Sequence, residues 1–282
     1  MRVIALTVLV MMAFAANSVL NRMAVGAGEI GAMEFALIRL VAGAATLLML
    51  CRYRQQSIAQ SARLSLLGGG SLALYMIGFS LAYRSLDAGL GALILFGVVQ
   101  ITMFGWGALR GAAVSSGQYL GAVVAFGGLA YVLWPAGSVQ VPLTGAAFMA
   151  AAGLGWAIYS LLGRQVQTPL AATTMNFLWA SVMVVPLVWV LGEAERVPVL
   201  GAGLAVAAGA VTSGLGYALW YRVLPQLQPA VAATVQLSVP VIAMMAGVVG
   251  LGEVLTLRLL IGTLVVLGGI ALVIMAAPRK AG

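Results

Sequence analysis

Residues 120–133 of the chain read LGAVVAFGGLAYVL, and a similar stretch, IGTLVVLGGIALVI, occupies residues 261–274. The two stretches share six identical positions at a constant offset of 141, including Gly121, Gly127 and Gly128. A recurrence at half the length of a chain indicates an architectural repeat. We interpret the glycines and aliphatic side chains of these stretches as helix-packing chemistry, and we use the repeat to align the two halves of the chain.

The repeat reaches back to the first apolar run of the chain. Ser18 and Arg22 match Ser160 and Arg164 at an offset of 142. The run that follows Arg2 therefore belongs to the repeat, and we expect a retained membrane helix and not a cleaved signal peptide. The predicted repeats are residues 1–137 and 138–282, which together form one integral membrane domain.

The composition is that of a membrane protein. Of the 282 residues, 63% are hydrophobic and only 7% are charged, whereas soluble domains carry about a quarter charged residues. Apolar runs long enough to cross a bilayer follow one another with short polar interruptions. We predict an all-α polytopic protein with ten transmembrane helices, near residues 3–25, 30–51, 64–84, 88–109, 116–134, 143–163, 170–191, 200–222, 229–250 and 257–276.

The basic residues are distributed unevenly between the predicted loops. If the N-terminus is cytoplasmic, nine Lys and Arg residues fall inside and four outside, which favours both termini in the cytoplasm of a bacterial inner membrane. Five helices per half mean that the second half enters the membrane upside down. Such inverted repeats are typical of secondary transporters, whose binding site lies near the bilayer midplane between the halves.

Composition also excludes several kinds of site. The net charge of +8 comes from single basic residues in separate loops and not from a stripe, so we expect no nucleic-acid partner. The chain has no histidine, and its one cysteine is Cys51, so metal sites of the His/Cys type are excluded. Gly68-Gly69-Gly70 is followed by no lysine and begins an apolar span, which argues against a phosphate loop. We expect no cofactor.

The second predicted span holds Arg39, the ninth holds Pro240 and is followed by Leu251-Gly252-Glu253, and the last holds Gly262 and Gly268-Gly269. On these residues the sequence resembles the drug/metabolite transporter superfamily and its EamA-type family of ten-helix proteins over the whole chain. The first half departs from the pattern, with Arg110-Gly111-Ala112 at the position that corresponds to 251–253. Within the superfamily the chain looks most similar to bacterial exporters of amino acids, aromatic ones included. The resemblance implies export by alternating access and leaves the substrate open.

Aromatic side chains recur on one face of the third predicted span. Tyr75, Phe79 and Tyr83 are spaced four residues apart, and the repeat pairs Phe79 with Tyr217 and Tyr83 with Tyr221. Tyr83 and Tyr221 stand near helix ends, which favours an interfacial belt. For Tyr75, Phe79 and Tyr217, a cavity lining and plain helix packing are equally good interpretations.

Amides and hydroxyls lie within the fourth and ninth predicted spans. Gln100, Gln236 and Ser238 fall near mid-membrane, where lipid offers polar groups no partner. Pro240 cannot donate to the carbonyl of Gln236, so we predict a hinge there and a free acceptor for a substrate. The alternative is that these polar side chains join neighbouring helices.

The sixth and first spans add two candidates. Trp156 lies beside Gly153 and Gly155, which leave room for a substrate or let another helix approach. Asn17 falls at a similar depth. The predicted substrate-binding residues are thus Asn17, Tyr75, Phe79, Gln100, Trp156, Tyr217, Gln236 and Ser238.

Arg39 lies inside the second span and is costly in hydrocarbon unless it is paired or faces water. It could hold a substrate carboxylate, but we favour a structural role with partners on other helices, because the second helix looks peripheral in this family. No carboxylate falls at the middle of any span. We therefore expect transport that needs no obligatory proton and is electroneutral for zwitterions.

We predict an exporter of small amphipathic metabolites, mainly amino acids with aromatic or apolar side chains, and no enzyme. Its partners would be the substrate and the lipid bilayer, and we expect a monomer or a weak dimer. A broad-specificity drug or nucleoside exporter of the same fold is the alternative. An intramembrane enzyme would need nucleophile–base pairs that the sequence does not offer, and a channel would show no saturable counterflow.

Overall fold

The computed structural model describes residues 2–109, 115–133, 141–163, 166–192, 197–227, 235–236 and 238–276. Within these ranges every regular element is helical, which confirms the all-α prediction. The elements are α1 (Arg2–Asn21), η1 (Arg22–Gly26), α2 (Ala32–Tyr53), α3 (Ala62–Ala82), α4 (Ala88–Leu109), α5 (Ser116–Leu133), α6 (Leu143–Gly163), α7 (Pro169–Leu191), α8 (Val199–Ala207), η2 (Ala208–Leu215), α9 (Gly216–Val223), η3 (Leu224–Gln226), α11 (Ser238–Leu251) and α12 (Leu257–Met275).

The helices are membrane helices by length and composition. Six in the described part of the chain are long and apolar enough to cross a bilayer, and three shorter apolar helices accompany them. Helices satisfy their own backbone hydrogen bonds, which hydrocarbon requires. The helix ends agree with the predicted spans to within two residues, apart from the span at 229–250, of which residues 229–234 and 237 lie outside the described ranges.

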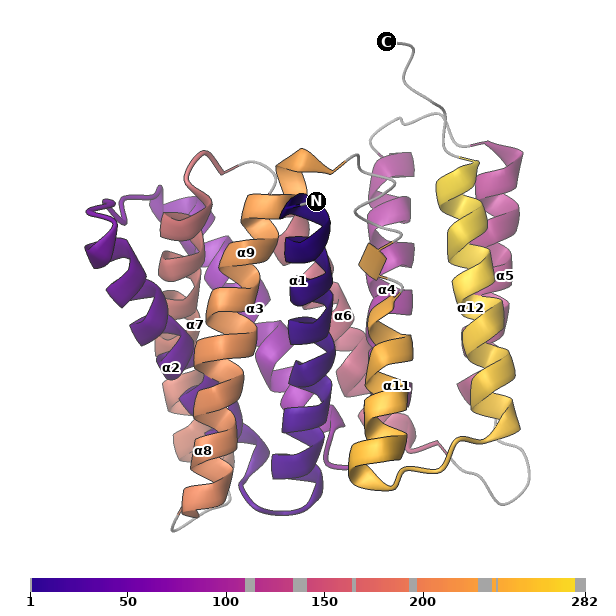
Figure 1. Cartoon of the computed structure of the whole chain (residues 1–282), viewed down its shortest axis with the longest axis horizontal. Coiled ribbons are helices and arrows are strands. Elements are labelled where there is room, and N and C mark those ends of the chain that lie inside the picture. The colour runs from indigo at the N-terminus through magenta and orange to yellow at the C-terminus, as the bar shows by residue number, and fades with distance from the viewer. Residues whose placement is uncertain are drawn as a thin grey trace.

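In Figure 1 the helices stand side by side as a bundle. Helix α1 begins at the upper end of the bundle in this view. The most extensive contacts join α3 to α6, α2 to α7 and α5 to α12. In Figure 1, α5 and α12 form a pair at one edge of the bundle, beside α4 and α11. Helix α1 lies between the two sides and touches α11, η2, α9 and α4.

The two repeated stretches pack directly against each other, because they form most of α5 and α12. A Cβ atom added to Gly121 would lie 2.6 Å from the carbonyl oxygen of Gly269, and one added to Gly128 would lie 2.9 Å from the backbone nitrogen of Val266. Only glycine allows the two backbones to come so close. The interpretation as packing chemistry is confirmed for Gly121, Gly128, Gly262 and Gly269, whereas a Cβ atom at Gly127 or Gly268 would meet no described atom within 4 Å.

One long helix is interrupted by a π-helical segment in its middle. Residues Val199–Val223 run without a break through α8, η2 and α9. Within η2, Gly209 abuts α2, and a Cβ there would overlap the carbonyl oxygen of Arg39. Short π-helical segments often occur at functional sites, and here the segment brings Thr212 and Ser213 to the interior of the bundle, where both are buried.

Candidate functional site

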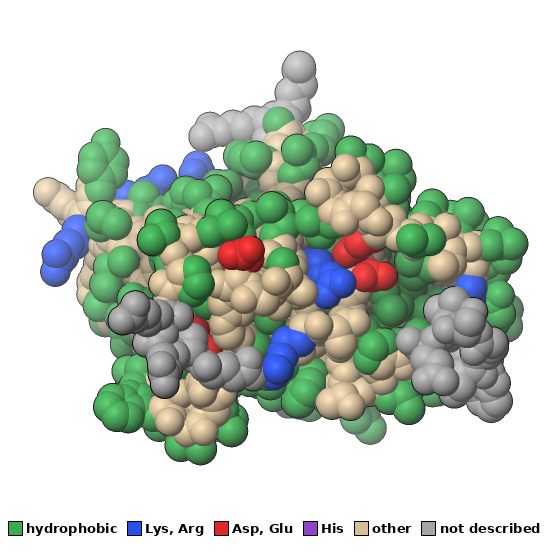
Figure 2. Space-filling model, turned by 90° about the horizontal axis from the view of Figure 1, so that it is seen from below, with side chains coloured by type: hydrophobic (Ala, Val, Ile, Leu, Met, Phe, Trp, Pro, Cys, Tyr) green, Lys and Arg blue, Asp and Glu red, His purple; other side chains and the backbone are tan. Residues whose placement is uncertain are grey.

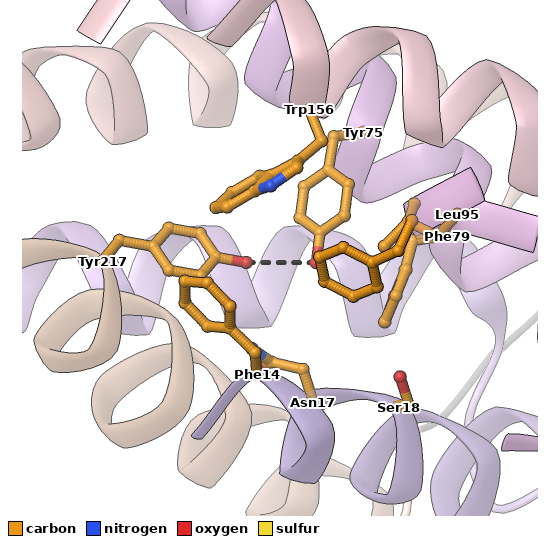
Figure 3. Close-up of a pocket in the computed structure, with 9 residues that line it drawn as sticks. Phe14, Asn17, Ser18, Tyr75, Phe79, Leu95, Trp156 and Tyr217 are labelled. Carbon is orange, nitrogen blue, oxygen red and sulfur yellow. Dashed lines mark hydrogen bonds between the residues drawn. The ribbon is translucent and has the colours of Figure 1, made fainter. Parts of the chain in front are cut away.

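A small pocket lies inside the bundle, and both halves of the chain contribute to it. Helices α1, α3 and α4 supply most of its lining, and α6 and α9 supply the rest. The space left between the side chains is about 10 Å³, roughly the room of one water molecule. The structure is therefore closed around this point. The lining residues are Phe14, Asn17, Ser18, Tyr75, Phe79, Leu95, Phe96, Trp156 and Tyr217 (Figure 3).

Aromatic rings form most of the wall. The ring of Trp156 lies with its centroid 4.8 Å from that of Tyr217 and 5.0 Å from that of Tyr75. Phe14 meets both Trp156 and Tyr217 edge to face, at 5.5 and 5.7 Å. Phe79 packs on Tyr75 with the centroids 5.2 Å apart. The rings fill each other's space in the closed structure, and a flat apolar molecule could replace some of these contacts.

A hydrogen-bond network centred on Arg39 lies behind the rings. The side chain is completely buried. Its Nε donates to Ser213 Oγ at 2.8 Å, and its Nη2 donates to the hydroxyl oxygens of Tyr217 at 3.1 Å and Tyr75 at 3.3 Å. The Tyr217 hydroxyl in turn donates to that of Tyr75 at 3.1 Å (Figure 3). The guanidinium carbon is 5.0 Å from the ring centroid of Phe79, a cation–π contact.

The network continues to α1 through Asn17. Ser213 Oγ donates to Asn17 Oδ1 at 3.1 Å, and the Thr212 hydroxyl donates to the same oxygen. Asn17 Nδ2 donates to the Thr212 carbonyl oxygen at 3.3 Å. Three helical segments from both halves, α1, α2 and η2, are thus joined by buried polar groups at the edge of the pocket.

The structure places the predicted site residues in two groups. Asn17, Tyr75, Phe79, Trp156 and Tyr217 line the pocket together. Gln100, Gln236, Ser238 and the predicted hinge residue Pro240 do not line it.

These remaining residues lie on α4 and at the start of α11. Gln100 is half-buried on α4, and Gln236 is buried just before α11. Ser238 Oγ donates to the Val235 carbonyl oxygen at 2.6 Å. Pro240 is the third described residue of α11, and Val235 and Gln236 before it are also helical; the hinge at Pro240 stays a prediction. The stretch 228–234, which holds the start of the predicted span, lies outside the described residues.

One sequence-based interpretation is wrong. Tyr83 and Tyr221 are not interfacial residues, since both are buried and donate inward, to the carbonyl oxygens of Ala88 and Tyr159. Helix α2 lies at an edge of the bundle in Figure 1 and adds no residue to the pocket lining, but Arg39 on it bonds two of the lining residues. The expectation that Arg39 finds partners on other helices is confirmed. Phe14 was missed altogether, although it lies one turn before Asn17 and so on the same face of α1.

A cluster of charged residues closes the lower end of the bundle. Arg22 Nη2 lies 3.4 Å from Asp87 Oδ1, and its Nε lies 3.6 Å from Glu253 Oε1. Glu253 also accepts a hydrogen bond of 2.8 Å from the Ala88 backbone N–H. The cluster joins the end of α1, the α3–α4 loop and the α11–α12 loop. Acidic and basic side chains meet near the centre of this face in Figure 2.

The pKa of Glu253 is raised above its ordinary value of 4.5. Partial burial is the largest cause, and the negative charge of Asp87 adds to it, whereas the Ala88 N–H and Arg22 act in the opposite direction. In the whole described part of the chain, this cluster included, no three Asp, Glu, Cys or His side chains come together as a metal site.

Three comparisons place the chain among known proteins. The model of the EamA-like transporter family matches residues 143–275. The chain is 45% identical over 278 residues to "Uncharacterized protein PA1977" of Pseudomonas aeruginosa, covering 99% of this chain and 96% of that protein. It is 26% identical over 247 residues to "Uncharacterized transporter YwfM" of Bacillus subtilis, covering 86% of this chain and 83% of the other.

A solved crystal structure shares the fold. It superimposes with a TM-score of 0.68, covers 95% of this chain and 97% of its own chain, and is 19% identical in sequence. At that identity the likeness concerns the fold alone.

Proposed function

We propose that this chain is a membrane transporter of the EamA-like family, whose model matches residues 143–275, and that it exports small amphipathic metabolites, chiefly amino acids with aromatic or apolar side chains. Transport proceeds by alternating access, in which the two halves rock around a site that stays inside the bundle. The bilayer and the substrate are its only partners in this scheme.

The pocket is the observation that carries the proposal. Six aromatic rings surround it, and the amide of Asn17 and the hydroxyls of Ser18 and Tyr75 lie on its wall. Aromatic and apolar substrate side chains would stack on Trp156 and Tyr217, while the polar groups bind the backbone part of an amino acid. The pocket must widen to receive either part.

The course of the helices supports the inverted repeat. The end of α1 lies with Asp87 and Glu253 at the lower end of the bundle. The end of α6, its repeat mate, lies at Gly163 beside Tyr221, near the end of α9. In Figure 1, α9 ends at the upper side, so α1 and α6 run in opposite directions. We take this as the ten-helix arrangement of two inverted five-helix repeats.

We place the protein in the bacterial inner membrane with both termini in the cytoplasm, as the distribution of Lys and Arg favours. The lower end of the bundle then faces outward. The ion pairs of Arg22 with Asp87 and Glu253 hold this end closed. They have to separate whenever the pocket opens to the outside.

The test is uptake into proteoliposomes of a panel of labelled amino acids, nucleosides and cationic drugs, with and without a pH gradient. We expect saturable counterflow of aromatic and apolar amino acids that does not depend on the gradient. A panel in which only nucleosides or drugs move would favour the alternative, a broad-specificity exporter. Uphill movement driven by the pH gradient would contradict the predicted independence from protons.

A further inference from the structure

Arg39 is a buried cation that has no anion beside it in the described part of the chain. Its side chain is fully buried, and a guanidinium keeps its charge in proteins. Among the described residues, its partners are the hydroxyls of Ser213, Tyr75 and Tyr217, and no carboxylate lies within ion-pair distance of it. A buried charge that is not balanced by an opposite charge is strongly disfavoured.

The hydrogen bonds around Arg39 leave donors in excess. Three of its five N–H groups are used, and Nη1 is buried without an acceptor. Both phenol oxygens accept from Nη2, and the Tyr217 hydroxyl donates to that of Tyr75, so the Tyr75 O–H has no acceptor among the described residues. Trp156 Nε1 is also buried without one. Unused donors of this kind lack the acceptor that buried polar groups normally have.

These donors surround the pocket. Tyr75, Trp156 and Tyr217 line it directly. Arg39 lies immediately behind Tyr75 and Phe79, with its guanidinium carbon 5.5 and 5.0 Å from their ring centroids. A molecule in the pocket would reach Arg39 only where these rings move aside.

Acceptors for an ammonium group, in contrast, are few. The pocket wall holds no aspartate or glutamate. The amide oxygen of Asn17 already accepts from Ser213 and Thr212. A cation would also meet the positive charge of Arg39 close by. The aromatic faces could contact an ammonium group weakly, but nothing on the wall requires one.

We propose that Arg39 binds the carboxylate of the transported molecule, and that the substrate class is aromatic or apolar monocarboxylates, for which an amino group is dispensable. This inference rests on the proposed function and specifies its site. The carboxylate accepts from Arg39 Nη1, with the free phenol proton and Trp156 Nε1 as further donors. The apolar body of the substrate lies among the rings. One carboxylate balances the single charge of Arg39.

The competing interpretation is that Arg39 only joins α2 to α3 and η2. It predicts that the charge of the ligand is irrelevant to binding. A series of ligands with one common ring and different head groups separates the two interpretations without any mutation. Phenylalanine carries both groups, 3-phenylpropionate the carboxylate alone, 2-phenylethylamine the ammonium alone, and 3-phenylpropanamide neither.

The first measurement uses the purified full-length protein at neutral pH. Ligand-induced thermal stabilisation in detergent reports binding, and inhibition of counterflow in proteoliposomes reports access to the transport site. We expect phenylalanine and 3-phenylpropionate to act in both assays, and the amine and the amide to bind about 30-fold more weakly or worse. Equal binding of the propionate and the propanamide would overturn the inference.

The second measurement uses variants. Arg39→Gln should abolish the preference for 3-phenylpropionate over the propanamide, and Arg39→Lys, which keeps the charge but not the planar fork, should retain part of it. The matched control is Arg258→Gln. Arg258 lies on α12, which adds no side chain to the described pocket lining, and it donates to the Tyr131 carbonyl oxygen. A folded Arg39→Gln protein with an unchanged preference contradicts the inference.

The outcomes remain separable from those of the proposed function. If the amine or nucleosides move and the carboxylates do not, the carboxylate site is wrong while export of amphipathic metabolites stands. If none of the four ligands binds, the inference is wrong, and the wider uptake panel decides whether the proposed function falls with it. If the Arg39 variants do not fold, the ligand series on the unmodified protein still gives the answer.

Discussion

Arg39 of α2 and Tyr217 of α9 are joined by a buried hydrogen bond of 3.1 Å, although they are 178 positions apart in the sequence. The bond crosses from the first half of the chain to the second. If the halves rock against each other, this bond and the one from Arg39 to Ser213 must lengthen or move with α2. The polar network therefore supports the pocket wall, and relative motion of the two halves has to change its hydrogen bonds.

Tyr217→Phe tests that bond while keeping the ring. The change leaves an N–H of a charged, buried guanidinium without its acceptor. We expect the free energy of unfolding to fall by about 1–3 kcal/mol, measured by thermal unfolding in detergent. Tyr131→Phe is the matched control, because the Tyr131 ring is half-exposed on α5. An equal effect of the two substitutions would contradict this role of the Tyr217 hydroxyl.

Trp156→Phe tests the aromatic wall. The indole contacts Phe14, Tyr75 and Tyr217, and a smaller ring loses part of each contact. We expect KM for an aromatic substrate to rise about 2–10-fold, with expression and folding retained. Trp189→Phe on α7 serves as the control, since that indole is 87% exposed. Unchanged transport kinetics in Trp156→Phe would remove the residue from the site.

Glu253 gives the lower end a predicted pH dependence. Because its pKa is raised in the folded protein, the folded state holds more protons than the unfolded chain at pH values between 4.5 and the raised pKa. The contribution of Glu253 to stability is therefore most favourable at acid pH and declines as the pH rises through that window.

Glu253→Gln removes this titration. We expect the thermal stability of the variant, measured relative to the unmodified protein, to improve as the pH rises from about 4.5 to about 7.5. Glu29→Gln, at the same end of the bundle, is the comparison. A difference in stability that is constant with pH would contradict the raised pKa of Glu253, and one that changes in the opposite direction would show that the Arg22 ion pair outweighs burial there.

Gly121→Ala should separate α5 from α12. The added methyl group would lie 2.6 Å from the Gly269 carbonyl oxygen and 2.7 Å from the Val273 nitrogen, and backbone atoms cannot give way without moving the helix. We expect a loss of about 1–3 kcal/mol in stability and an unchanged KM. Gly127→Ala, where a Cβ meets no atom within 4 Å, should be neutral or slightly stabilising. Equal destabilisation by both would contradict this packing.

The helices and their ends were predictable because apolar length is a strong local signal in membrane proteins. The aromatic candidates were predictable in part. The four-residue spacing placed Tyr75 and Phe79 on one face, and the repeat led to Tyr217; the structure brings all three to one pocket. Whether they bind a substrate stays a prediction, as do the boundary of the halves at residue 137 and the roles of Gln100 and Gln236.

The position of Arg39 could not be read from the sequence in the same way. Its helix is apolar on all sides, so no periodicity shows which face points inward. The π-helical turn of η2 also shifts the face of the helix that carries Ser213 and Tyr217, which uniform helical spacing does not anticipate. The sequence signal that did exist was the cost of an unpaired arginine in hydrocarbon. It indicated a buried partner without saying which helix held it.

The uncompensated charge of Arg39 has an energetic consequence for export. In a rocking mechanism the arginine stays inside the bundle, so the charge moved across the membrane is that of the cargo. A monocarboxylate carries one negative charge outward, and an interior that is negative by 100 mV drives it with about 2.3 kcal/mol, close to a 50-fold concentration ratio. The membrane voltage alone would then expel such anions, and zwitterions would leave only down their own gradient.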